Sequence, residues 1–181
     1  MDKETKALFE KLESNDKNEV YEAYTAILVL TEKEVDWAYE VWDQWKGNLS
    51  SKDNHKRSLA AQFLSSLAIS DPEGRMLLDF PAVWKVTMDK KFVTARHSLQ
   101  SIWKIGLAGD EQKELVTTHL IERYRTCMSE KNGTLIRFDI IQGLKNLYDK
   151  CHDENIKGEA LKLIEEEEDS KYRKKYGLVW N

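Results

Sequence analysis

Apolar residues recur at every third or fourth position along most of the chain, which is the spacing that places side chains on one face of an α-helix. The last such pattern, for example, runs through Ile136, Ile140, Leu144 and Leu147. No stretch alternates apolar and polar residues for long enough to indicate a β-strand. The pattern therefore predicts an all-α protein, with helices over residues 18–31, 34–47, 54–69, 91–107 and 134–150.

Residues that begin or interrupt helices separate these segments. Asp71 precedes Pro72, a pair that predicts a helix with Asp71 as its N-cap and Pro72 at its first position. Thr134 and Asp153 are expected to cap the helices that follow them. Pro81 lies within an otherwise helical pattern and predicts a kink or a break there. With these boundaries we expect about ten helices.

Three of the predicted helices share a pattern that recurs at a fixed interval. Each has an arginine near its start (Arg57, Arg96 or Arg137), followed by apolar residues at helical spacing. The arginines are 39 and 41 residues apart, and each interval holds two helices. A two-helix unit of about 40 residues is typical of α-solenoids, in which successive helix pairs stack and bury a continuous core.

The segment Thr94–Gly106 resembles the second helix of a HEAT-like (armadillo-type) repeat, in which an arginine after an apolar residue is followed by Ala and Leu-Gly at helical spacing. Leu135–Leu144 is similar. The resemblance implies a right-handed α-solenoid of about four two-helix repeats over residues 18–168. Residues 1–17 and 169–181 then form N- and C-terminal cap helices, and the whole chain is a single domain.

Composition agrees with this class and indicates a compartment. Glycine and proline total 10 of 181 residues, too few for the closely spaced turns of an all-β protein. Cys127 and Cys151 cannot build a disulfide framework, and no apolar run approaches the ~20 residues of a membrane-spanning helix. The charged start of the chain lacks the apolar stretch of a secretory signal. We therefore expect a cytoplasmic protein with no membrane partner.

The repeated arginines are the first candidate binding residues. We favour a structural interpretation, because a long charged side chain beside an apolar face usually pairs locally, and HEAT-like repeats use this arginine in a ladder between units. Acids lie near each arginine in the sequence, namely Asp53, Asp89 and Asp139. In the functional interpretation, Arg57, Arg96 and Arg137 line a concave surface and bind acidic or phosphate groups of a partner.

Six tryptophans are the second feature that distinguishes the chain. Packing between stacked helices explains most large aromatic side chains, and this is the interpretation we favour. The alternative is an aromatic groove for a peptide or for unstacked bases. Trp45, next to Lys46 near the end of its predicted helix, is the one that we expect to be most exposed. Trp45 and Trp103 are therefore candidate partner-binding residues.

Charge is distributed unevenly, with a net −6 over residues 1–49, +4 over residues 50–137 and −2 over residues 138–181. The basic middle segment is a candidate nucleic-acid surface, although DNA-binding proteins usually concentrate more positive charge. The chain contains no phosphate-binding loop, dinucleotide-binding motif or nucleophile elbow, and its four histidines show no metal-ligand spacing. We therefore expect no cofactor, no metal and no catalytic residue.

These observations favour a non-catalytic binding or scaffolding protein that holds a protein partner on the concave face of the solenoid, and they leave enzyme activity open. The alternative is a DNA-binding repair enzyme that resembles the HEAT-like alkylpurine DNA glycosylases, which clasp DNA on a basic concave face. Such an enzyme would use residues such as Trp103, Arg96, Arg137 and Asp139, but no matching motif surrounds them. HEAT-like lyases that attach bilins to phycobiliproteins are a weaker resemblance.

Overall fold

The structure, a computed structural model, describes residues 1–180 and is all-α, which confirms the fold class that the spacing predicts. Of the described residues, 77% are helical, and they contain no β-strand. The α-helices are α1 (Lys3–Lys11), α2 (Lys17–Leu30), α3 (Ala38–Asn48), α4 (Asn54–Leu67), α5 (Arg75–Val86), α6 (Phe92–Ser101), α7 (Asp110–Thr126), α8 (Gly133–Cys151), α9 (Glu154–Glu165) and α10 (Ser170–Gly177). Short 3₁₀-helices follow three of them: η1 (Ala68–Ser70), η2 (Ile102–Leu107) and η3 (Cys127–Ser129).

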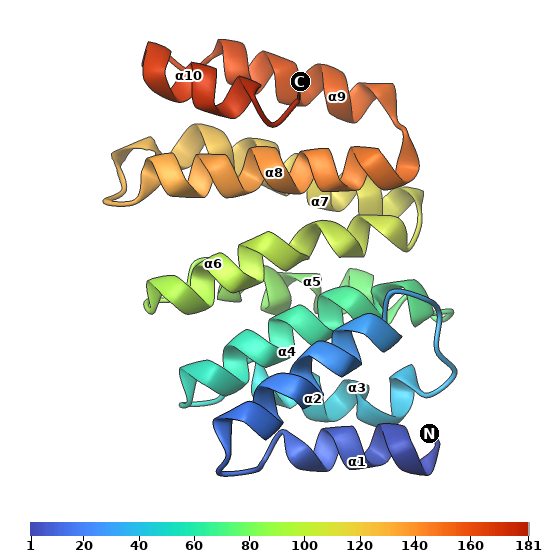
Figure 1. Ribbon diagram of the computed structural model, residues 1–181. Helices are drawn as coiled ribbons and strands as arrows, with labels where there is room; N and C mark the ends of the chain where they lie inside the picture. Colours follow the sequence, from blue (N-terminus) through green and yellow to red (C-terminus); the bar gives the residue numbers. More distant parts are fainter. Residues whose placement is uncertain (181) are drawn as a thin grey trace.

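The helices stack in chain order, with α1 at one end of the molecule and α10 at the other (Figure 1). Helices α2, α4, α6 and α8 form a front layer, and α3, α5 and α7 lie behind them. Helix α4 packs against α6, α6 packs against α8, and each of these helices also contacts the helix that precedes it. Each front helix and the helix before it therefore form one step of the stack.

The core runs along the stack between the two layers. It forms because each helix buries its apolar stripe against the opposite layer, which removes that surface from water. The largest fully buried side chains are Trp42, Tyr124, Tyr176, Phe63, Phe80, Ile27, Leu64, Leu67, Met76, Leu99, Ile102 and Ile105.

Trp45 belongs to this core. Its side chain lies edge-on to Phe63 of α4, with ring centroids 4.8 Å apart, and the ring of Phe9 of α1 lies 6.2 Å from it. The residue is only 4% exposed. The prediction that Trp45 is the most exposed tryptophan is therefore wrong, because α1 and α4 close over it.

Aspartates begin five of the helices, and each accepts a backbone N–H from the first turn, as an N-cap does. Asp153 caps α9 in this way, as expected; the others are Asp2, Asp16, Asp53 and Asp169. Thr134 does not cap α8, which already begins at Gly133.

The region of Asp71 and Pro72 differs from the prediction. Helix α5 begins only at Arg75, after Gly74 adopts a left-handed backbone conformation with φ +70°. Asp71 nevertheless reaches the start of α5, because its two carboxylate oxygens accept the N–H groups of Arg75 and Met76 at 3.0 and 2.7 Å. Helix α5 then continues through Pro81 to Val86, so this proline does not split it.

The last helix closes one end of the core. Tyr176 of α10 is fully buried, and its hydroxyl donates a hydrogen bond to the backbone carbonyl of Thr134 in α8 at 2.9 Å. Tyr172, Val179 and Trp180 pack against the same cluster while staying partly exposed. In the described part of the chain, every helix is too short or too polar to cross a membrane.

Candidate functional site

All three repeated arginines form ion pairs with an acid of the next helix pair. Arg57 of α4 binds Asp89 through two hydrogen bonds of 2.6 and 3.0 Å. Arg137 of α8 binds Glu167 at 2.8 Å, and both residues are buried. Asp89 lies in the turn before α6, and Glu167 lies in the turn before α10. These two arginines therefore connect successive steps of the stack.

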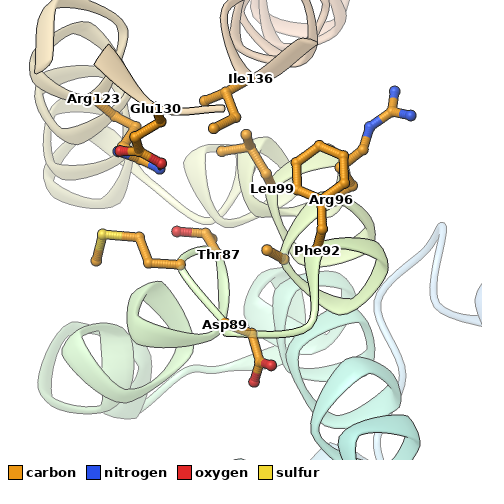
Figure 2. Close-up of a pocket in the computed structure, with 10 residues that line it drawn as sticks. Thr87, Asp89, Phe92, Arg96, Leu99, Arg123, Glu130 and Ile136 are labelled. Atoms are coloured by element: carbon orange, nitrogen blue, oxygen red, sulfur yellow. The ribbon is translucent and has the colours of Figure 1, made fainter. Parts of the chain in front are cut away.

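The middle arginine departs from this arrangement. Arg96 of α6 binds Asp139 of α8, at 2.7 and 2.9 Å, and not Glu130 in the turn between α7 and α8. Glu130 binds Arg123, with 2.9 Å between Nη2 and Oε2. Figure 2 shows that Arg96 points away from the cavity of about 150 Å³ that Arg96 and Glu130 both line. As a result, the Arg96 side chain is 32% exposed, against 12% for Arg57.

Asp139 is the centre of a polar cluster at the seam between α6 and α8. It is 3% exposed, and its carboxylate also accepts a hydrogen bond from Gln100 Nε2 at 3.0 Å. The hydrogen bonds to Asp139 raise the pKa of the Arg96 guanidinium. Gln100 and Trp103 lie one and two turns beyond Arg96, on the same side of α6 and η2.

A groove of about 430 Å³ opens where the front helices end, and we call it the Trp103 groove. Trp103 is half-buried and lies against α8 at Gly143, where an added Cβ would be 3.8 Å from the Trp103 Cβ. The residues that line the groove come from the ends of α2, α4, η2 and α8: Thr31, Glu32, Ser66, Ile69, Trp103, Lys104, Leu107, Asn146, Asp149 and Lys150.

Lys104 is the residue of this groove with the most distinctive chemistry. Its Nζ donates a hydrogen bond to Ser66 Oγ at 3.0 Å, and no carboxylate among residues 1–180 lies within ion-pair distance of it. Burial lowers the pKa of the Lys104 ammonium, while the charge of Glu32 opposes this effect. A lysine without an acidic partner, next to a partly exposed indole ring, suits a carboxylate or a carbonyl group of a partner.

A second groove, of about 630 Å³, opens on the same layer near the N-terminal ends of α4 and α6, and we call it the Tyr21 groove. Tyr21 of α2 is 68% exposed, and Val93 of α6, one turn before His97, is 65% exposed. Five of the eleven lining residues are apolar or aromatic and two are histidines: Leu12, Ser14, Lys17, Val20, Tyr21, Tyr24, His55, Ser58, Leu59, Gln62 and His97.

The structure places the five candidate residues in three different settings. Arg57, Arg96 and Arg137 are held in ion pairs, Trp103 lines a groove of the front layer, and Trp45 is in the core. Asp89 pairs with Arg57 and Asp139 with Arg96, so the partners come from the following helix pair.

Sequence reasoning did not single out Tyr21 or His97, and it included Lys104 only in the basic middle segment considered as a nucleic-acid surface. Tyr21 lies three residues before Tyr24, a spacing that puts both on one face of the helix, so the sequence gives no sign that Tyr21 is exposed. The sequence does not predict the neighbours of Lys104 either, since its groove forms only where four helices meet.

Comparisons with protein-family models, curated proteins and solved structures found no match to this chain. In the part of the chain that the structure describes, no group of His, Cys, Asp or Glu side chains is arranged to hold a metal ion. The function of the front layer is therefore argued from its own geometry.

Proposed function

We propose that this chain is a HEAT-like helical-repeat protein that binds a protein partner on the face formed by α2, α4, α6 and α8. The observation that carries the proposal is that the Tyr21 groove and the Trp103 groove open on the same layer of helices. Along α6 and η2, Gln100 lies between His97 of one groove and Trp103 of the other. Aromatic and arginine side chains at such positions are the usual energetic centres of protein interfaces.

The proposal includes the architecture of the whole chain. About four two-helix repeats over residues 18–168 form a right-handed solenoid whose concave face is the front layer, and the terminal segments cap it. The arginine–acid pairs support this arrangement, because the arginines recur at intervals of 39 and 41 residues and each pair joins one helix pair to the next. We place this scaffolding function in the cytoplasm.

The chemistry of the two grooves defines the partner. The Tyr21 groove suits an apolar or aromatic side chain, because Tyr21, Tyr24 and Leu59 supply apolar surface. The Trp103 groove suits a residue that carries a carboxylate, which Lys104 binds at the edge of the indole ring. A partner segment that crosses α6 at Gln100 fills both grooves.

The test compares variants of the two grooves with a variant of the opposite layer. Tyr21→Ala combined with Trp103→Ala is expected to lose the protein that the wild-type chain retains from a native lysate. Leu78→Ala is the matched control, because Leu78 is 85% exposed and lies on α5 in the back layer. Circular dichroism checks that all variants fold. Equal retention by the wild type and the double variant contradicts the proposal.

The alternative, a DNA-binding repair enzyme, is less well supported by the contacts. Arg137 is buried against Glu167, and Asp139 is bound by Arg96 and Gln100, so neither is free for DNA. We expect a dissociation constant for duplex DNA above about 10⁻⁴ M at physiological salt, and no release of alkylated bases. Gel-shift titrations at two salt concentrations and a base-release assay test this. Tight binding that is lost in an Arg96→Ala, Arg137→Ala double variant that still folds by circular dichroism would instead favour the DNA function.

A further inference from the structure

A third groove lies away from the front-layer grooves, where the turn between α3 and α4 meets the turn between α5 and α6. Its volume is about 700 Å³, and five of its lining residues are cationic: Lys46, Lys52, Arg57, Lys85 and Lys90. We call it the lysine groove. The other residues that line it are Leu49, Ser50, Ser51, Ala82, Val86, Met88 and Asp89.

Two of the five cations are neutralised within the chain. Lys46 pairs with Asp79 at 2.7 Å, and Arg57 pairs with Asp89. The remaining three, Lys52, Lys85 and Lys90, are exposed and form no ion pair with any residue in the range 1–180. The groove therefore carries an excess of three positive charges.

The two turns that carry these lysines are held in place before any ligand binds. Arg57 Nη1 donates hydrogen bonds to the carbonyls of Ser51 and Lys52 at 2.7 and 3.1 Å, which fixes the first turn. The same guanidinium binds Asp89, and Asp89 accepts the backbone N–H of Lys91 at 2.8 Å, which fixes the second. A groove that is already ordered loses less conformational entropy when a ligand binds.

The groove also offers a neutral donor. Ser51 Oγ accepts the backbone N–H of Asp53 at 3.2 Å, which leaves the hydroxyl proton of Ser51 to donate to a ligand. Lysine ammonium groups are strongly hydrated point charges that bind phosphate oxygens, and a hydroxyl donor adds direction to such a contact.

Acids near the groove limit the size of the ligand. Asp43 lies close enough for its charge to act on Lys46, and Asp53 acts in the same way on Arg57. Beyond them, residues 1–49 carry a net charge of −6. A long polyanion such as duplex DNA extends beyond the groove and is repelled by this negative charge, whereas a compact polyanion stays within the groove. The volume is also within the ~300–1,000 Å³ that is typical of small-molecule sites.

We propose that the lysine groove binds a compact ligand that carries two or more clustered phosphate groups, held by Lys52, Lys85, Lys90 and the hydroxyl of Ser51. This site is separate from the face that we propose for the protein partner, and neither depends on the other.

The experiment uses sodium tripolyphosphate as the probe, with the full chain and isothermal titration calorimetry at constant ionic strength. A variant with Lys52→Gln, Lys85→Gln and Lys90→Gln is expected to bind at least about tenfold more weakly than the wild type, because three charge-assisted contacts are removed. The matched control is Lys3→Gln, Lys6→Gln and Lys33→Gln, which removes the same charge from exposed lysines elsewhere. The affinity of this control variant is expected to stay within about twofold of the wild type. When the titration is repeated at a higher salt concentration, the wild type should bind tripolyphosphate more weakly.

Three results overturn the proposal. The first is no binding of tripolyphosphate to the wild type. The second is an equal loss of affinity in the groove variant and the control, which shows that only net charge matters. The third is that a short DNA duplex binds more tightly than tripolyphosphate and that this binding requires the same lysines, which would make the groove a nucleic-acid site. Circular dichroism of both variants confirms that they fold.

Discussion

Arg137 and Glu167 form the most buried of the arginine–acid pairs, with side chains 9% and 0% exposed. Arg137 Nε also donates to the carbonyl of Tyr124 at 3.0 Å, and its guanidinium carbon lies 4.4 Å from the centre of the Tyr124 ring. Arg125 of α7 pairs with Glu166 at the surface, where the two side chains are 49% and 42% exposed. The pair of Arg137 and Glu167 therefore differs from it both in burial and in the contacts with Tyr124.

The difference in burial predicts that the two arginines contribute unequally to the free energy of unfolding. Arg137→Ala leaves the Glu167 carboxylate buried without a cationic partner and should lower the free energy of unfolding by about 3–5 kcal/mol. Arg125→Ala, at an exposed pair, should cost no more than about 1 kcal/mol. Urea denaturation followed by circular dichroism measures both. Similar losses for the two variants would contradict the larger contribution that we assign to the buried pair.

Gly106 is a second position where one residue determines packing. A Cβ added there would lie 3.0 Å from Leu147 Cδ2 and 3.5 Å from the Lys113 Cα, so η2 can approach α7 and α8 only without a side chain. Gly106→Leu should therefore destabilise the protein by about 1–3 kcal/mol through overpacking. Gly158→Leu is the control, because an added Cβ at Gly158 meets no atom within 4 Å. Thermal denaturation compares them, and equal melting temperatures would contradict the expected overpacking.

At the scale of elements, the sequence predicts the existence of the helices better than their ends. The pattern over residues 18–31 corresponds to α2 (Lys17–Leu30), because an amphipathic stripe is a property of the helix itself. Asp153 also caps α9 as predicted, since an N-cap contact is local. The start of α5 was missed because Gly74 takes a left-handed conformation between Asp71 and the helix, which a proline signal alone does not reveal.

The C-terminal helix closes the last apolar surface of the stack. Deletion of residues 170–181 removes the buried ring of Tyr176 and exposes the apolar side of α8 and α9. We expect aggregation or a large fall in melting temperature. Tyr176→Phe is the control, because it keeps the ring and removes only the hydrogen bond to Thr134, at a cost of about 1 kcal/mol. A soluble truncated chain with an unchanged melting temperature would make this segment a free binding peptide.

Two tyrosines at this end of the molecule predict an alkaline limit of stability. Burial raises the pKa of Tyr124 and of Tyr176, so both keep their protons in the folded state. Tyrosines of the unfolded chain lose their protons above about pH 10. The contribution of the two buried tyrosines to the free energy of unfolding is therefore complete below that pH and is lost as the pH rises further. Replacing both by Phe should flatten the fall in the free energy of unfolding above pH 10, whereas Tyr21→Phe should not. Denaturation curves at alkaline pH test this.

At the scale of the whole molecule, the stack places together residues that are distant in sequence. Trp45 is adjacent to Lys46 and near a helix end, yet α1 and α4 bury it, because tertiary contacts decide exposure. Lys104 acquires its neighbours Ser66 and Glu32 only when η2 meets α4 and the end of α2. The repeated arginines were recognisable from their spacing, but their partners were not, since each acid comes from the next helix pair.

The most direct test of the proposed partner-binding face is hydrogen–deuterium exchange of the full chain, with and without the protein that it retains from lysate. The partner should slow exchange in α2, α4, η2 and the C-terminal half of α8, which surround the Tyr21 and Trp103 grooves, and leave α3, α5 and α7 unchanged. Protection confined to α3, α5 and α7, or no protection at any helix, would contradict the account.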